Sequence, residues 1–482
     1  MTSICAPLSV VPVHAHTWSG TDASTMSAPV ICHGTAAACL PVIKSTPAAR
    51  QTRKCASSAV SRNLSNRRRS AVVTYASESS APSGTKKVVF VGGTGRVGAA
   101  AASALLKSDS SVKSVVLAGR EEQNARDAME RHPNLNGMAS FAKVDLNDAN
   151  SIATAIAGAD LVVHSAGPFQ SGGDRGTVID QCIEAGIPYL DVCDDAKYAS
   201  VAKQKSEAAK QKGVPCITTA GVYPGVSNLM AADMIAANRE AGEDLDAEVE
   251  YVLYSYFCAG SGGVGDTILA TSYMLCGEDV ECWEDGKKVI TRPATQRKVV
   301  DFGKKCGKRE VFLYNLPETI SARAVFGADT IKTRFGTAPG VWNLAMSAMA
   351  VIVPKDVLLN PETAKILASL TAPLVRAVDG LVGERTAMRI DVKLKNGKLA
   401  GGIFNHPKLK DAVGDSTAAF ASAMLRGETE PGVWYPEEPE AIADREALLL
   451  AASKGCDNYV INQAAWMLES KPINLGFGMY LD

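Results

Sequence analysis

The sequence lacks the spacings that metal sites and disulfide frameworks need, although its 482 residues include 12 cysteines. No C-x-x-C pair and no histidine pair at a metal-ligand spacing occurs, so no metal is expected. Four cysteines lie in the first 76 residues. The others are interpreted as buried thiols, since a free cysteine packs like a small apolar side chain. These are Cys182, Cys193, Cys216, Cys258, Cys276, Cys282, Cys306 and Cys456.

Long apolar runs and several catalytic motifs are missing as well. No stretch of about 18 uninterrupted apolar residues occurs, so no transmembrane helix is expected. The apolar segments 340–354 and 366–382 are interpreted as core or dimer interface, and contact with a membrane surface stays open. No G-x-S-x-G elbow, Walker lysine or Ser–Tyr–Lys arrangement is found, so hydrolase, kinase and short-chain reductase chemistry is not indicated.

Acidic residues are almost absent from the first 76 residues, where Asp22 is the single acid among eight lysines and arginines. With its Ser, Thr and Ala bias, this composition predicts a chloroplast transit peptide over 1–76; the alternative is a disordered regulatory tail. Residues 77–85 are expected to be a flexible leader. Removing 1–76 changes the formal charge from −1 to −8, so no nucleic-acid partner is expected. The predicted location is the chloroplast stroma, and association with a membrane stays open.

A glycine-rich turn stands between a predicted strand and a predicted helix. The apolar run 88–91 is typical of a central parallel strand, and Gly93, Gly95 and Gly98 follow it as G-x-G-x-x-G. Such a turn lets a backbone approach a pyrophosphate at a helix N-terminus. The predicted cofactor contacts in this turn are Gly92, Gly93, Thr94, Gly95, Arg96, Val97 and Gly98.

The next strand tips refine the cofactor prediction. Strand 114–118 ends in Gly119 and Arg120, with no carboxylate to bind the ribose hydroxyls of NAD. An arginine there favours the additional phosphate of NADP, although Arg120 could instead be a solvated side chain. Strand 140–144 ends in Asp145, which either contacts the adenine or caps the next helix.

The fourth strand, 160–165, leads into Ala166, Gly167, Pro168 and Phe169, which we expect beside the nicotinamide ribose. Further strands at 187–191 and 214–218, separated by a helix at 197–211, complete the alternation. The predicted fold class is α/β, a Rossmann-type doubly wound parallel sheet over residues 86–223.

A second, α+β domain is predicted over 224–430. Its strongest signal is a hairpin around Asn396 and Gly397, and a glycine-rich turn at 260–265 either holds a substrate anion or only joins a strand to a helix. Residues 431–482 are expected to pack back on the first domain.

Candidates for a proton donor cluster after the fifth strand and at the exit from the sheet. They are Tyr189, Asp191, Cys193, Asp194, Asp195 and Tyr223. Asp191 is preferred because it lies at the carboxyl end of a strand, and Tyr223 is the second choice; Asp191 could instead cap a helix. His164 lies inside an apolar strand and is interpreted as a core histidine.

Four motifs carry a resemblance to a known family. The segments VVFVGGTGRVG, HSAGPF, CIEAGIPYLDVCDD and AGVYPGVSNLMA resemble the saccharopine dehydrogenase-like oxidoreductases. The resemblance implies a Rossmann domain, a second domain with substrate and dimer contacts, and a C-terminal segment that returns to the first domain. A homodimer is therefore expected.

The predicted function is NADP-dependent hydride transfer to or from a small carbonyl, imine or enoyl substrate. An NADP-binding protein without turnover, a redox sensor or assembly factor at a plastid membrane, is the alternative. True saccharopine or polyamine chemistry is a third hypothesis.

Overall fold

The computed structural model describes residues 85–171, 177–260, 266–470, 473–476 and 479–481. The predicted transit peptide, the leader up to residue 84, the loop 172–176 and most of the glycine-rich turn, 261–265, lie outside these ranges, so their roles stay predictions. Residues 81–482 group into one unit by their contacts.

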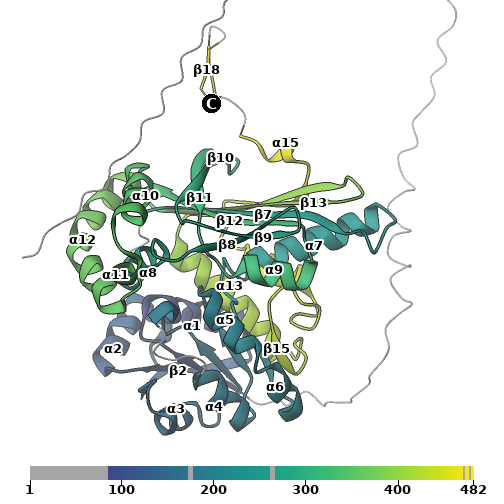
Figure 1. Ribbon diagram of the computed structural model, residues 1–482. Coiled ribbons are helices and arrows are strands. Elements are labelled where there is room, and N and C mark those ends of the chain that lie inside the picture. Colours follow the sequence, from purple (N-terminus) through teal and green to yellow (C-terminus); the bar gives the residue numbers. More distant parts are fainter. Residues whose placement is uncertain (1–84, 172–176, 261–265, 471–472, 477–478, 482) are drawn as a thin grey trace, which may run out of the picture. The chain divides into compact units, whose positions relative to one another are not determined.

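The first sheet has seven strands in the order β15-β6-β5-β4-β1-β2-β3, and every pair in it is parallel (Figure 1). The predicted doubly wound sheet is confirmed. Its strands are β1 (Lys86–Val91), β2 (Val112–Gly119), β3 (Ala139–Lys143), β4 (Leu161–His164), β5 (Tyr189–Asp191), β6 (Pro215–Ile217) and β15 (Gly432–Trp434). Its helices are α1 (Arg96–Ser108), α2 (Glu122–Arg131), α3 (Ala149–Ile156), α4 (Thr177–Ala185), α5 (Ala196–Lys203) and α6 (Ser206–Lys212).

Strand β1 is covered on both faces, as its continuous apolar run predicts. Successive side chains of a strand point to opposite faces. Val88 and Phe90 join one core cluster with the alanines of α1 and α2, and Val89 and Val91 join a second cluster with α3 to α6. All four side chains are completely buried. The glycine turn that follows β1 therefore starts from a strand fixed by both layers.

One predicted helix is wrong in extent. The segment 197–211 forms two helices, α5 and α6, with a break at Gln204 and Lys205. At the start of α6 the Ser206 hydroxyl oxygen accepts a hydrogen bond of 3.0 Å from the Val433 backbone N–H. Since β15 runs beside β6, the break lets this side chain meet the C-terminal segment, a contact that local periodicity does not reveal.

The second sheet has nine strands and mixed direction. Its main order is β10-β11-β12-β7-β13-β14-β16, and β8 pairs with both β12 and β9. The hairpin predicted around Asn396 is confirmed as the antiparallel pair β13 and β14. The strands are β7 (Val249–Ala259), β8 (Val280–Glu284), β9 (Lys287–Thr291), β10 (Thr295–Asp301), β11 (Lys308–Leu313), β12 (Thr330–Ala338), β13 (Arg385–Leu394), β14 (Leu399–His406) and β16 (Asn458–Gln463).

The remaining elements surround the second sheet or join it to the first. They are α7 (Val226–Ala241), α8 (Asp266–Leu275), α9 (Glu318–Phe326), α10 (Val341–Ile352), α11 (Lys355–Leu358), α12 (Pro361–Val382), α13 (Leu409–Leu425), α14 (Arg445–Ala452), α15 (Ala465–Leu468) and the small hairpin β17 (Ile473–Gly476) and β18 (Met479–Leu481).

Helix α13 falls in the range predicted for the second domain, 224–430, yet it packs along α1 of the first. Small residues make this approach possible. A methyl group added at Gly414 would lie 3.0 Å from the carbonyl carbon of Ala100. A close approach of two helices through glycine and alanine is a property of the pair, so neither segment alone predicts it.

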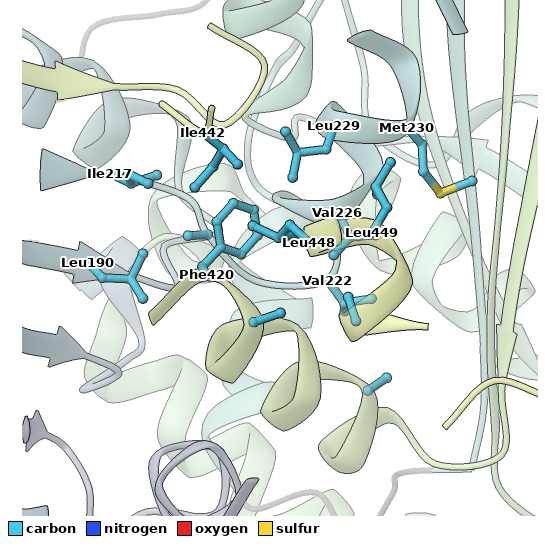
Figure 2. Packing of buried hydrophobic residues seen from close by; sticks show 14 of the residues in the cluster. Leu190, Ile217, Val222, Val226, Leu229, Met230, Phe420, Ile442, Leu448 and Leu449 are labelled. Atoms are coloured by element: carbon cyan, nitrogen blue, oxygen red, sulfur yellow. The ribbon is translucent and has the colours of Figure 1, made fainter. Parts of the chain in front are cut away.

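The largest core cluster continues from the first sheet into the second. Figure 2 shows part of it, with Leu190 and Ile217 from the first sheet near Phe420 of α13. The other labelled side chains come from the segment leading into α7, from α7 itself, and from the C-terminal segment with α14. They are Val222, Val226, Leu229, Met230, Ile442, Leu448 and Leu449. The two sheets therefore share one core.

Candidate functional site

The glycine turn after β1 has no room for side chains. Gly92 has φ of 80°, and a methyl group on it would lie 2.6 Å from the Ala166 backbone nitrogen. A methyl group on Gly98 would lie 2.5 Å from Ser165 Oγ and 2.6 Å from the Gly92 carbonyl oxygen. Glycine is therefore required at both positions, where the turn, the first turn of α1 and the end of β4 meet.

The N-terminus of α1 suits an anion. Gly95 is its N-cap residue, no side chain caps it, and its first turn carries no acidic residue. The N–H groups and dipole of a helix N-terminus attract phosphate. The predicted pyrophosphate contacts are thus grouped at one point in the fold, at the carboxyl edge of the sheet.

Arg120 is exposed directly after β2, beside this turn. Its neighbour Gly119 packs against Thr94, because a methyl group there would lie 2.5 Å from Thr94 Oγ1. Arg131, from the end of α2, lies close as well, with its Nη2 donating to the Thr94 carbonyl oxygen at 3.5 Å. Two exposed guanidinium groups therefore flank the side of the turn where a ribose phosphate is predicted.

Asp145 organises its own turn. Its Oδ1 accepts hydrogen bonds from the backbone N–H and the side-chain amide of Asn147, at 3.0 and 3.2 Å. The N-cap of α3 is Asp148, whose side chain accepts from the Asn150 N–H. The interpretation of Asp145 as the helix cap is therefore wrong, and its predicted adenine contact stays a prediction.

The loop after β4 brings a backbone, rather than an aromatic face, to the edge of the sheet. Phe169 is buried, and its ring meets those of His164 and Tyr198 edge to face, with centroids 5.1 and 4.9 Å apart. Burial lowers the pKa of His164 to about 3, so the neutral core histidine that the sequence predicted is confirmed. Gly167 leaves space above the loop, where the nearest atom to an added methyl group is 3.7 Å away.

Asp191 accepts hydrogen bonds from residues that follow β5 and β6. Its Oδ1 accepts from the Cys193 N–H at 3.0 Å, the Thr219 N–H at 2.8 Å and the Thr218 hydroxyl at 3.1 Å. The side chain is completely buried, and burial raises its pKa to about 6. These contacts position the backbone at the ends of β5 and β6; proton donation by Asp191 stays a prediction.

Tyr223 links the exit of the first sheet to the second. Its hydroxyl lies 2.9 Å from Thr386 Oγ1 on β13, and its ring stacks on Tyr256 of β7 with centroids 4.6 Å apart. Burial raises the pKa of the phenol well above its usual value. The tyrosine is thus held on both sides at the junction, and its catalytic role stays a prediction.

A further carboxyl group joins the site from the second domain. Gln170, just after the β4 loop, donates to Asp194 Oδ1 at 3.1 Å. Glu278, between α8 and β8, accepts from the Asn315 side chain at 3.1 Å. Burial raises the pKa of Asp194 to about 6 and that of Glu278 to about 7, and the charges of Asp195 and Asp194 raise the pKa of Glu278 further. The Asp194 carboxyl group therefore lies beside the loop after β4, and Glu278 of the second domain interacts electrostatically with it.

Residues 88–217 match the family model described as "Saccharopine dehydrogenase NADP binding domain". The first domain belongs to this family. The resemblance predicted from the motifs is confirmed, and so is NADP as the cofactor. Gly92 and Gly98 fit this family model because only glycine allows the turn to pack this closely against α1 and the end of β4. The match supports the general function of an NADP-dependent oxidoreductase.

Two solved structures share the fold of this chain. One is the saccharopine dehydrogenase (L-Glu forming) of Saccharomyces cerevisiae, 14% identical with a TM-score of 0.53, which covers 78% of this chain and 99% of its own. The other is the homospermidine synthase of Legionella pneumophila in complex with NAD, 11% identical with a TM-score of 0.53, which covers 79% of this chain and 92% of its own. At these identities the likeness shows the fold alone. No curated protein matched the chain.

Sequence reasoning missed Arg131 and Glu278. Arg131 is the last residue of an ordinary amphipathic helix, and it lies 37 positions after Thr94, whose carbonyl oxygen it contacts. Glu278 lies in a turn with no motif around it. Asp194 was a candidate, but only the contact with Gln170 distinguishes it from the neighbouring acids.

Proposed function

We propose that this chain transfers a hydride between NADP and a small carbonyl, imine or enoyl compound in the chloroplast. The observation that carries the proposal is the hydrogen bond of 3.1 Å that holds the carboxyl group of Asp194 beside Gln170, just after the β4 loop. The pKa of Asp194 and that of Glu278, which interacts electrostatically with it, are both raised by burial. In open α/β sheets, ligands bind at this carboxyl edge. A pure nucleotide-binding site has no need of two titratable acids there.

NADPH, when bound, supplies the hydride. Gly92, Gly95 and Gly98 hold its pyrophosphate against α1, and Arg120 with Arg131 binds the phosphate on its ribose. Asp194 or Glu278 would donate the proton that the reduction needs. A carbonyl oxygen would accept it as the hydride reaches the carbon, an imine nitrogen would accept it before the hydride arrives, and the α-carbon of an enoyl compound would accept it after the hydride has reached the β-carbon. In the opposite direction the same carboxylate takes the proton back.

The pKa values suit this role. A carboxyl group with a pKa of about 7 is half protonated near neutral pH, so it can serve as acid in one direction and base in the other. Acidic surroundings also stabilise a cationic group. Among the three substrate classes, the protonated imine therefore fits the site best.

The test begins with titration of the mature chain, residues 77–482, by NADPH and by NADH. NADPH consumption is then followed across carbonyl, imine and enoyl compounds. Asp194→Asn and Glu278→Gln should both leave NADPH binding intact, and the one that removes the proton donor should lower kcat by about 100-fold or more. Asp148→Asn, the same change at the exposed cap of α3, is the matched control and should leave turnover unchanged.

Binding of NADPH without consumption of any compound would support the alternative, an NADP-binding protein without turnover. The chloroplast location has its own test, because the mature chain isolated from plastids should begin between about Arg69 and Ser80. An intact Met1 in that compartment would contradict it.

A further inference from the structure

Large apolar side chains that face solvent are concentrated on the helices after β12. Among the described residues, half of the large hydrophobic side chains that are exposed lie between positions 341 and 374. We call this set the aliphatic face. Its members are Val341, Leu344, Val351, Ile352, Val357, Ile366, Leu370 and Leu374.

Helix α10 exposes only apolar residues. Its exposed positions are 341, 344, 345, 348, 351 and 352, which follow the period of one helix face and are all Val, Leu, Ala or Ile. The exposed fractions of Leu344 and Ile352 are 70% and 76%. The polar residue Asn343 points the other way, where it is buried and hydrogen-bonds the backbone of Thr337. A helix face in water is ordinarily polar, so this one is built to be covered.

Helix α12 extends the face. Its buried side, Ala364 and Ala368, packs on Tyr273 and Met274 of α8, with Met349 of α10 against the same cluster. The exposed side carries Ile366, Leu370 and Leu374, with exposed fractions of 59%, 71% and 57%. Figure 1 draws α10, α11 and α12 together beside the second sheet. The two helices therefore pack on one cluster, and each leaves an apolar stripe exposed.

The exposed charges on α11 and α12, up to position 377, balance in sign: Asp356 and Arg376 carry opposite charges, and the others form ion pairs. Lys355 of α11 forms an ion pair with Asp279, and Lys365 of α12 pairs with Glu362 at 2.8 Å. A protein interface combines an apolar core with hydrogen bonds, about one for each 100 to 200 Å². The exposed positions of α10 carry no side-chain donor or acceptor for such bonds. A partner surface that makes only apolar contacts and carries no charge therefore matches α10 better than a protein surface does.

We infer that the aliphatic face docks on a lipid surface with uncharged headgroups, inserting its side chains into the acyl boundary. Helix α10 has 12 residues, fewer than the about 20 needed to cross a bilayer. Among the described residues, no helix combines the length and hydropathy of a membrane span. Trp342, in the first turn of α10, is partly exposed, and a tryptophan suits the boundary between headgroups and acyl chains.

Flotation of the full chain with phosphatidylcholine vesicles tests the inference. These vesicles carry no net charge, so the basic N-terminal segment adds no electrostatic attraction. The wild type should float, and Leu344→Ser, Val351→Ser and Leu370→Ser together should reduce binding by about tenfold for each side chain. Leu245→Ser with Leu450→Ser, at comparably exposed positions outside the face, should bind like the wild type. Equal binding by the triple variant, or no flotation of the wild type, would overturn the inference.

Brominated phosphatidylcholine provides a second readout. Quenching of tryptophan fluorescence by these lipids should disappear in Trp342→Phe and persist in Trp466→Phe, which removes an exposed tryptophan on α15. The opposite pattern would place another surface on the membrane. Sedimentation without vesicles tests whether a second copy of the chain covers the face instead. A wild-type dimer that the triple variant converts to monomers would show this, and would also overturn the inference. NADPH binding by every variant serves as the check of folding.

Discussion

Helices α1 and α10 are both rich in apolar residues, yet their surroundings are opposite. The four consecutive alanines of α1, residues 99–102, are all buried, between the first sheet and α13. Helix α10 buries one side against the second sheet and exposes Val, Leu and Ile on the other. Small side chains let another helix approach from outside, whereas large ones form a ridge that the described part of the chain does not cover. Apolar content alone therefore does not tell whether a helix is enclosed.

The largest expected effect comes from filling the turn before α1. Gly98→Val would force a side chain into Ser165 and the Gly92 carbonyl, so we expect NADPH affinity to fall by about 100-fold or more and the unfolding free energy by about 3 kcal/mol. Fluorescence titration and urea unfolding measure the two effects. Gly340→Ala, at the N-cap of α10 with no atom within 4 Å of the new methyl group, is the control and should change neither.

Separating α1 from α13 should have the next largest effect. Gly414→Leu places a side chain where Ala100 already leaves no room, so the unfolding free energy should fall by about 3 kcal/mol with NADPH affinity less affected. Leu344→Ala on α10 should change stability by less than about 0.5 kcal/mol, because its side chain is mostly exposed. Equal losses from both substitutions would remove the contrast between the two helices.

The shared core should also make stability depend on pH. Glu318 and Glu437 are buried together, and burial raises the pKa of each to about 7 from the usual 4.5. The folded state therefore holds these protons more tightly than the unfolded state. The resulting stability is fully present below about pH 4.5 and is lost as pH rises through 7.

Between pH 5 and pH 8, Glu437→Gln should reduce the loss of unfolding free energy by about 2 kcal/mol. Urea unfolding at each pH measures this effect. Asn228 donates to Glu437 at 2.9 Å, and the glutamine oxygen can still accept that hydrogen bond. Glu310→Gln, at an exposed ion pair with Arg297, is the comparison and should leave the pH dependence of the wild type in place. A wild type whose stability does not fall over this range would refute the assignment.

The smallest expected effect is on the preference for NADPH over NADH, which we assign to Arg120 beside the glycine turn. Arg120→Asp should weaken NADPH by about tenfold more than NADH, because it replaces a charge-assisted contact with the ribose phosphate by repulsion. Arg131→Ala should act in the same direction, more weakly. Equal losses for both nucleotides would show that the phosphate lies elsewhere.

The first sheet could be read from the sequence because its signals are local. Apolar runs such as 88–91 predict strands, the glycines after them predict turns, and the segments between strands predict helices. Each of these predictions depends only on residues that are adjacent in the sequence. Strand β15 has only three residues, and each lies 217 positions after its partner in β6, so no local pattern indicates the pairing.

The candidate site was predictable only where it is made by the glycine turn. Glu278 comes from the second domain, and its place depends on tertiary packing. Asp191 was chosen for its place at a strand end, although its Oδ1 accepts hydrogen bonds from two backbone N–H groups and from the Thr218 hydroxyl. The apolar character of 340–354 was visible, but its exposure depends on what the opposite side of α10 packs against.

The pairing of β15 with β6 has a consequence for biosynthesis. The ribosome must synthesise all of β7 to β14 before residue 432 can complete the nucleotide-binding sheet. The first domain therefore cannot reach its final form as an independent N-terminal unit during translation, and its open edge at β6 must wait for the end of the chain. A nascent chain stopped before this strand would expose that edge to other polypeptides.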